Sequence, residues 1–177
     1  MKYIFSELRI YFCNNWINGI PSHSIRLWYY RKVMGFRIGQ NSSILMHCKF
    51  NAAKGFEMGQ NSVINADCKL DTRGGLIIGN NVSISSDVII LTADHDMDSP
   101  DFAGRNKAVK IEDYAWVGTR ALILPGTNLG KASVIAAGAV VARDVDELNV
   151  VAGIPAKFIK KRAEHLEYTL RYRRLFQ

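Results

Sequence analysis

The feature that most constrains the fold of this chain is an internal repeat. The phrase GFRIGQNSSI begins at residue 35 and recurs as GFEMGQNSVI at residue 55 and as GLIIGNNVSI at residue 75. Large apolar residues fall six positions apart within each block, at Ile38, Ile44, Phe50, Met58, Ile64, Leu70, Ile78, Ile84, Ile90, Ile111, Val117, Ile123, Leu129, Ile135 and Val141. Because six is a multiple of two and not of 3.6, these side chains share one face of an extended chain but not of an α-helix.

Residues suited to corners separate the apolar positions. Gly follows the apolar residue at Gly39, Gly59, Gly79, Gly118 and Gly130, and Asn or Asp follows at Asn41, Asn61, Asn80, Asn81 and Asp113. Both types tolerate left-handed backbone. Small residues recur at Ser42, Cys48, Ser62, Cys68, Val82 and Val88. The pattern predicts an all-β solenoid, a parallel β-helix of three-sided coils with about 18 to 20 residues each, about five coils in all.

The tandem hexapeptides resemble those of the left-handed parallel β-helix acyltransferases, and the left-handed winding is implied by that resemblance, since ordinary crossovers are right-handed. We expect the β-helix over 35–159, with an inserted loop at 92–110. Residues 1–34 are expected to form a cap of short helices, and residues 160–177 a basic C-terminal helix.

Composition limits the class of protein. The chain has 177 residues, 48% of them apolar, and holds no apolar run long enough for an integral membrane segment. We expect no signal peptide, because the N-terminal residues form no continuous apolar block that ends in a small-residue cleavage site. Three cysteines argue against a disulfide scaffold and favour a cytoplasmic location. The net charge is +7, with basic residues towards the C-terminus at Lys157, Lys160, Lys161, Arg162, Arg171, Arg173 and Arg174. We expect no nucleic acid partner, and a peripheral membrane contact is left open.

One loop interrupts the repeat, with the sequence LTADHDMDSPDFAGRNKAVK, and it holds His95 among acidic residues. A calcium loop of the EF-hand type is excluded because Ser99 and Arg105 stand where Gly and Glu are needed. A zinc site built from three histidines is not supported, since the coils offer only His47 and His95. We therefore expect no metal.

A neutral imidazole can take a proton from an attacking hydroxyl, and Asp96 or Asp94 could stabilise the imidazolium that forms. The segment LTADHDMDSPDF resembles that of sugar O-acetyltransferases of the colanic-acid and lipopolysaccharide type and, more distantly, of the galactoside and maltose acetyltransferases. The resemblance implies that His95 is the general base. Direct transfer is favoured, because no Ser or Cys lies in a recognisable nucleophile motif.

The same resemblance implies a site for acetyl-CoA. The stretch IEDYAWVGTRALILPGTNLGKASVIAAGAVVARDV is similar to coils that bind coenzyme A, with contacts expected at Trp116, Gly118, Thr119, Ala137, Ala142 and Arg143. In the closing VVAGIPAKFIKK, Lys157 and Lys160 fall where basic residues face the phosphates of coenzyme A. The resemblance further implies a homotrimer with each active site between two subunits.

For the acceptor, the resemblance points to Asn65 and Asp71 as sugar contacts, with Asp96 on the substrate side and Asp67 as a competitor to Asp71. A purely structural role as corner residues is the alternative for each. The sequence thus predicts an O-acetyltransferase acting on a sugar hydroxyl. Transfer to an amino-sugar nitrogen, serine or an antibiotic, a metal-dependent hydratase, and a non-catalytic β-helix subunit are the alternatives.

Overall fold

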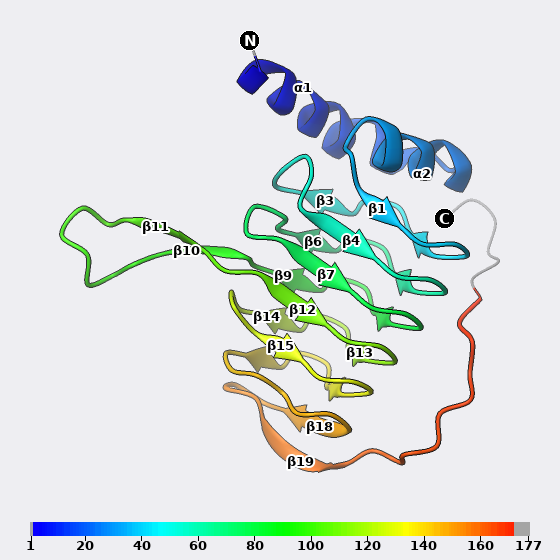
Figure 1. Cartoon of the computed structure of the whole chain (residues 1–177), viewed down its shortest axis with the longest axis vertical. Coiled ribbons are helices and arrows are strands. Elements are labelled where there is room, and N and C mark those ends of the chain that lie inside the picture. Colours follow the sequence, from blue (N-terminus) through cyan, green and yellow to red (C-terminus); the bar gives the residue numbers. More distant parts are fainter. Residues whose placement is uncertain (1, 172–177) are drawn as a thin grey trace.

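The chain forms a three-sided parallel β-helix with helices across its N-terminal end (Figure 1). The structure is a computed structural model and describes residues 2–171. The helical elements are α1 (Lys2–Asn15), the 3-10 helix η1 (Ile17–Gly19) and α2 (His23–Lys32).

Three sheets form the sides of the prism. The first contains β1 (Arg37–Ile38), β4 (Phe56–Met58), β7 (Leu76–Ile78), β12 (Val109–Ile111) and β15 (Asn128–Leu129). The second contains β2 (Ser43–Ile44), β5 (Val63–Ile64), β8 (Ser83–Ile84), β13 (Trp116–Val117), β16 (Val134–Ile135), β18 (Asn149–Ala152) and β19 (Lys157–Lys161). The third contains β3 (Lys49–Phe50), β6 (Lys69–Leu70), β9 (Ile89–Ile90), β14 (Leu122–Ile123) and β17 (Val140–Val141).

Each coil adds one strand to each sheet, in parallel and in register. Ile44 pairs with Ile64, and Ile64 pairs with Ile84 one coil further on. Five full coils are present, and the chain continues into a partial sixth that holds β18, so the solenoid has about six turns against the five predicted. In Figure 1 the front strands run from left to right and the chain returns behind them while it descends, so the winding is left-handed, as predicted.

The interior of the prism is the hydrophobic core. Fourteen of the fifteen repeat positions are buried, and the remaining one, Ile38, packs partly buried against them. Each fully buried aliphatic side chain of this size contributes about 2 kcal/mol of transfer free energy. The prediction that a period of six places these residues on one inward face is confirmed.

The small residues at the corners stack from coil to coil. Ser42 Oγ donates to the carbonyl of Gly59, at 2.6 Å, and accepts the N–H of Ser62, at 3.0 Å. Ser62 Oγ repeats the pattern one coil on, donating to the carbonyl of Gly79 at 2.8 Å. Cys48 and Cys68 are buried core thiols that donate to backbone carbonyls of the next coil.

An aromatic cluster closes the N-terminal end of the prism. Tyr30 of α2 packs against Phe36 and Phe50, and Phe56 adds a further ring within 5.7 Å of Phe50. Helix α1 is joined to the first coil by Asn14, whose amide donates to the Phe50 carbonyl and whose Oδ1 accepts the Phe50 N–H. In the described part of the chain, no helix is long and apolar enough to cross a bilayer.

The prediction of a basic C-terminal helix is wrong over the described residues. Strand β19 folds back antiparallel on β18, and residues 162–171 then run without helix along one corner of the prism (Figure 1). Arg162 donates to the carbonyl of Tyr114 at 2.9 Å, and the ring of Tyr168 packs edge-on against the ring of Tyr114. These contacts hold the segment in an extended course along the coils, so no helix forms there. Arg173 and Arg174 lie outside the described residues.

Candidate active site

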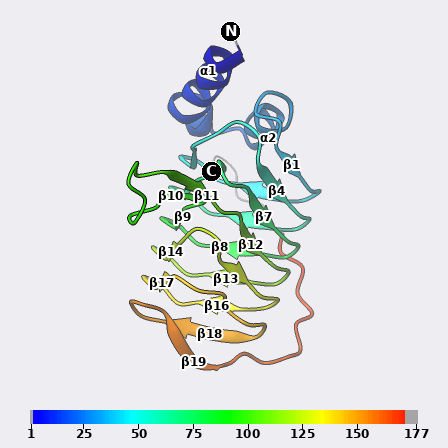
Figure 2. The same ribbon diagram turned by 60° about the vertical axis from the view of Figure 1, so that its left-hand side comes forward.

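The inserted loop forms a two-stranded arm. Strands β10 (Ala93–His95) and β11 (Gly104–Asn106) pair antiparallel and project from the side of the prism between β9 and β12 (Figures 1 and 2). The Asp94 carboxylate accepts two hydrogen bonds from the Arg105 guanidinium opposite it, at 2.8 and 3.0 Å. Arg105 also lies 3.6 Å from the Asp96 carboxylate. The hydrogen bond from Arg105 holds the pKa of Asp94 below its ordinary value.

His95 is exposed near the end of the arm, and its orientation is set by Phe102. Its Nδ1 lies 2.8 Å from the Phe102 carbonyl oxygen, and the two rings stack at 4.2 Å with an interplanar angle of 7°. A carbonyl can only accept, so Nδ1 carries the hydrogen of this bond. In the neutral imidazole the lone pair is then on Nε2.

The sequence predicted Asp94 or Asp96 as the partner of His95. In the structure both carboxylates form ion pairs with Arg105 instead. Phe102 was missed. Its role depends on its backbone carbonyl and on the register of the hairpin, which residue types and spacing do not reveal. Arg105 was noted only as a reason to reject a calcium site.

Four of the eight expected cofactor contacts lie at or beside one corner of the prism: Trp116, Gly118, Thr119 and Ala137. Trp116, on β13, is 47% exposed and donates from its indole nitrogen to Ser85 Oγ at 3.2 Å. Thr119 follows at the next corner, and its carbonyl accepts the N–H of Gly138, beside the exposed Ala137 of the coil below. We call the three exposed residues Trp116, Thr119 and Ala137 the strip.

Gly118, which lies between Trp116 and Thr119 in the sequence, is buried. A Cβ at this position would lie 2.6 Å from the backbone nitrogen of Ala137 and 2.8 Å from the Ile135 carbonyl. The absence of a side chain at Gly118 therefore allows successive coils to stack, whatever else binds nearby.

A second group of expected contacts meets at the C-terminal end of the prism. A cavity of about 490 Å³ is lined there by residues that include Ala142, Arg143, Lys157, Phe158 and Pro155. Lys160 is exposed on the same strand as Lys157. The two cations that line this cavity suit a phosphorylated ligand such as coenzyme A.

The residues expected to contact the acceptor are held by the scaffold. Asn65 donates from its side chain to the Ile84 carbonyl at 2.8 Å. Asp71 accepts hydrogen bonds from Arg73 and from the N–H of Thr92, the residue before the arm. Asp67 has a left-handed backbone, with φ 65°, which is the geometry of a corner residue. The sequence analysis missed Arg73 and Thr92 as partners of Asp71.

Within one chain the arm and the strip do not meet. The arm leaves the prism at the corner that follows β9, whereas Trp116 belongs to the preceding sheet, with β8 and β16. The sheet of β9, β14 and β17 separates the two corners.

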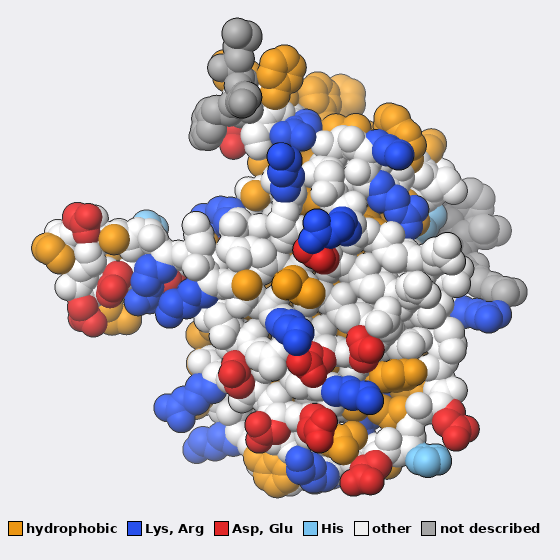
Figure 3. Space-filling model, viewed as in Figure 1, with side chains coloured by type: hydrophobic (Ala, Val, Ile, Leu, Met, Phe, Trp, Pro, Cys, Tyr) orange, Lys and Arg blue, Asp and Glu red, His pale blue; other side chains and the backbone are white. Residues whose placement is uncertain are grey.

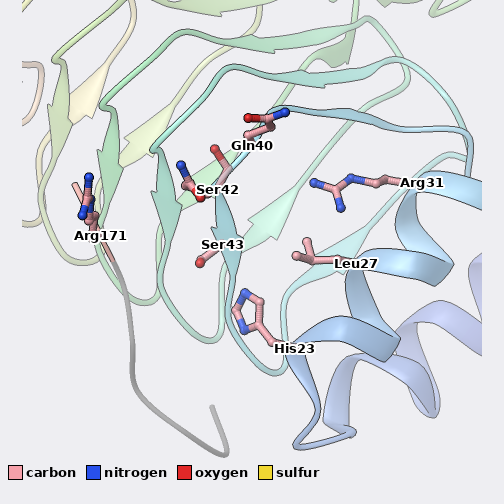
Figure 4. A pocket seen from close by; sticks show the side chains of 8 residues that line it. His23, Leu27, Arg31, Gln40, Ser42, Ser43 and Arg171 are labelled. Carbon is pink, nitrogen blue, oxygen red and sulfur yellow. The ribbon is translucent and has the colours of Figure 1, made fainter. Parts of the chain in front are cut away.

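A cavity of about 760 Å³ lies elsewhere, between α2 and the first coil (Figure 4). Its lining includes His23, Arg31, Ser43 and Arg171, and none of the expected site residues. Among residues 2–171, no group of three or more His, Cys, Asp or Glu side chains is placed to hold a metal ion.

Comparison with known proteins agrees with this architecture. Residues 108–143 match a family model described as the hexapeptide repeat of succinyl-transferase. A hexapeptide-repeat acetyltransferase of Vibrio cholerae O1 biovar eltor, solved with acetyl-coenzyme A, superposes with a TM-score of 0.82 at 25% identity, over 89% of this chain and 87% of that one. A galactoside acetyltransferase solved with coenzyme A gives a TM-score of 0.77 at 21% identity, over 95% and 86% of the two chains, which supports the fold.

Among curated proteins, a 2,3,4,5-tetrahydropyridine-2,6-dicarboxylate N-acetyltransferase of Staphylococcus aureus is 50% identical over 56 residues, 32% of this chain and 23% of that protein. The chain spans between 23% and 37% of the length of the first curated relatives that it matches. Fold and repeat together define a left-handed β-helix of hexapeptide repeats. The chain is similar to hexapeptide-repeat acetyltransferases, the resemblance that the sequence predicted.

Proposed function

We propose that this protein is an acetyl-CoA-dependent O-acetyltransferase that acts on a hydroxyl of a sugar or of a polysaccharide or lipopolysaccharide precursor. The observation that carries the proposal is the hydrogen bond between His95 Nδ1 and the Phe102 carbonyl. It leaves Nε2 of an exposed imidazole free to accept a proton in the neutral tautomer.

In the proposed reaction, the acceptor hydroxyl oxygen attacks the carbonyl carbon of the acetyl thioester while His95 Nε2 takes the hydroxyl proton. The new C–O bond is the ester, the C–S bond breaks, and the proton passes from the imidazolium to the departing thiolate. Acetyl-CoA, as the second substrate, supplies the thioester. A stacked aromatic ring and a backbone carbonyl fix the imidazole before the substrates arrive, which lowers the cost of orientation.

Acetyl-CoA is proposed to lie along the strip that contains Trp116, Thr119 and Ala137. Its phosphates would lie towards Arg143 and the lysines of β19. The small side chain of Ala142, which is exposed, would leave the backbone accessible to it, and Gly118 would act by letting the coils stack closely beneath it. Because the arm and the strip lie at different corners of one prism, a complete site needs His95 from one subunit and the strip from another. A homotrimer with three such sites is the proposed assembly.

Asn65, Asp71 and Asp96 are proposed to line the acceptor side of the site, with Asp71 also serving as an anchor of the arm. The acceptor could instead be an amine, a possibility favoured by the curated relative whose name specifies an N-acetyltransferase. The three buried thiols support a reducing compartment, and we place the protein in the cytoplasm.

The test is His95→Gln, which keeps the size and polarity of the side chain but removes the base. We expect kcat to fall by about 10²- to 10⁴-fold, the usual contribution of general-base catalysis. Coenzyme A should bind with unchanged affinity in calorimetry. His47→Gln, at an exposed corner of the first coil, is the matched control and should retain full turnover.

Wild-type turnover in His95→Gln would end the general-base proposal. A panel of sugars, amino sugars and amino acids, read by release of free thiol from acetyl-CoA, separates hydroxyl from amine acceptors. If the wild-type protein does not bind coenzyme A at all, the non-catalytic alternative replaces the enzyme.

A further inference from the structure

The outer surface of the N-terminal helices is apolar. Eight of the fifteen large hydrophobic side chains that are exposed in the described part of the chain lie between Ile4 and Trp28. On α1 and directly after it, the members of this set are Ile4, Phe5, Leu8, Tyr11, Phe12 and Trp16, with 44–65% of each exposed. On α2 they are Ile25 and Trp28. We name this set the outer apolar face.

Packing on the prism does not account for this face. The inner side of α1 already makes the contacts that hold it, through buried Cys13, through Asn14 and through Arg9, which donates to the Val33 carbonyl. A surface helix normally turns charged and polar residues to water on the side away from the core. Here the outward side of α1 is mostly aliphatic and aromatic, with Glu7 as its exposed acidic residue.

The positive charge of the protein is concentrated at the same end. Residues 1–54 contain eight Lys or Arg and one acidic residue, whereas residues 55–177 contain fifteen of each, so the net charge of +7 belongs to the helices and the first coil. Arg31, Lys32, Lys49 and Lys54 are exposed there. Figure 3 shows hydrophobic side chains over α1, with Lys and Arg side chains directly below them.

We propose that the outer apolar face and the cations around it form a docking surface for an anionic lipid bilayer. Helix α1 is about 21 Å long at 1.5 Å per residue, and it would lie in the plane of the membrane surface. Aromatic side chains such as Trp16, Tyr11 and Trp28 are the type that settles at the headgroup level. The exposed lysines and arginines attract acidic headgroups.

The charge distribution favours a bilayer over a second copy of the chain. Two copies that met through their helical ends would bring together two surfaces of the same sign, and both carry the surplus of +7. An acidic membrane offers the opposite charge and an apolar layer at once. The proposal goes beyond the acetyl-transfer reaction and does not depend on it, because docking involves neither the arm nor the strip.

The experiment is flotation of the full chain with vesicles, without acetyl-CoA. One set contains phosphatidylglycerol and phosphatidylcholine, and the other phosphatidylcholine alone. We expect binding to the anionic set and at least about tenfold less to the neutral set, since several cations act near the surface. Phe5→Ser combined with Phe12→Ser and Trp16→Ser should reduce binding by at least about tenfold through lost apolar burial. Lys32→Gln combined with Lys54→Gln should lower the affinity for anionic vesicles, and added salt should reduce the remaining binding less than it reduces that of the wild type.

Matched controls lie far from the helices. Ile159→Ser, 58% exposed on β19 at the other end of the prism, and Lys131→Gln, exposed at a corner of the fifth coil, should bind vesicles like the wild type. In a Trp116→Phe background only Trp16 and Trp28 remain as tryptophans. Their emission should shift to the blue on docking.

Four outcomes overturn the proposal. They are no binding to anionic vesicles, unchanged binding in the triple Ser variant, an unchanged emission spectrum in the Trp116→Phe protein, and self-association of the wild type that the triple Ser variant abolishes. Circular dichroism of each variant establishes that it is folded. The substituted side chains are exposed, so folding should be retained.

Discussion

Single side chains at the base of the arm determine where His95 is held. Asp71 is 1% exposed and accepts two hydrogen bonds from the Arg73 guanidinium, both at 2.9 Å, and one from the N–H of Thr92 at 3.1 Å. Thr92 in turn donates its hydroxyl to the Asp71 carbonyl at 3.1 Å. Because β10 begins at Ala93, this cluster fixes the point from which the arm starts.

Substitution of Asp71 by Asn should therefore destabilise the fold. The Asn side chain loses the charge-assisted hydrogen bonds from Arg73, and its NH2 group faces N–H donors with which it cannot bond. We therefore expect the free energy of unfolding to fall by about 2 kcal/mol. Urea unfolding followed by circular dichroism at neutral pH measures it. Asp87→Asn is the control, because that carboxylate is half exposed and 3.8 Å from Arg120, and it should change stability by less than about 0.5 kcal/mol. Equal losses in both variants would contradict the anchor role.

The same carboxylate gives a pH dependence with a definite sign. Burial raises the pKa of Asp71, but the hydrogen bonds from Arg73 and Thr92 outweigh it and hold the pKa below its ordinary value. The stabilisation is then fully present above the ordinary Asp pKa of about 3.9 and is lost as the pH falls through the lower folded pKa. The stability gap between wild type and Asp71→Asn should be constant near neutral pH and shrink in acid. A gap that widens in acid would refute this assignment.

At the level of elements, the arm is a short hairpin held mainly by its own contacts. Arg105→Gln removes the bidentate pair with Asp94 that joins its two strands. We expect faster amide exchange in β10 and β11 and a kcat lower by up to about 100-fold, because the imidazole is no longer held in position. The free energy of unfolding should change by less than about 0.5 kcal/mol, since the prism is untouched. Asp98→Asn, on the same arm, should leave exchange and turnover unchanged, and a matching loss there would contradict the role of Arg105.

The stacking of coils makes a separate prediction about Gly118. Gly118→Ala places a methyl group 2.6 Å from the Ala137 nitrogen, so coils four and five must move apart, and overpacking of this kind costs about 1–3 kcal/mol. Thermal or urea unfolding measures the loss. Gly104→Ala, where a Cβ would meet nothing within 4 Å, is the matched control and should be nearly neutral. If Gly118→Ala unfolds like wild type and only coenzyme A binding suffers, Gly118 acts through the ligand rather than through packing.

The elements also show what the sequence could predict. Inward positions such as Ile44 and Ile64 follow from periodicity, because a side chain spaced by an even number keeps its face in any extended chain. The prediction of a C-terminal helix was wrong because helix propensity is weak compared with tertiary contacts. Here Arg162 donates hydrogen bonds to the carbonyls of Tyr114 and Ala132 at a corner of the prism. The partner of His95 could not be predicted, since it is a carbonyl placed by the hairpin register.

At the scale of the whole molecule, the arm and the strip lie at different corners of one prism. The prism is joined by backbone hydrogen bonds through every coil, so closing this gap by bending the scaffold would break many of them. In the proposed homotrimer, a neighbouring copy would present its strip to the arm and complete the site without distortion. A cyclic assembly repeats this contact at each interface, as closed symmetry requires.

Subunit mixing tests this arrangement. His95→Gln removes the base from one side of each interface, and Trp116→Ala removes the indole from the other, so each homo-oligomer should be nearly inactive at low acetyl-CoA. The two variants are unfolded together and refolded in equal amounts. After random assembly, about one quarter of the interfaces should contain both His95 and Trp116. Thiol release should return to about a quarter of the wild-type rate. If both residues act within one chain, every site in the mixture lacks one of them and no activity returns, whereas a mixture of His95→Gln with itself gives the baseline for either result.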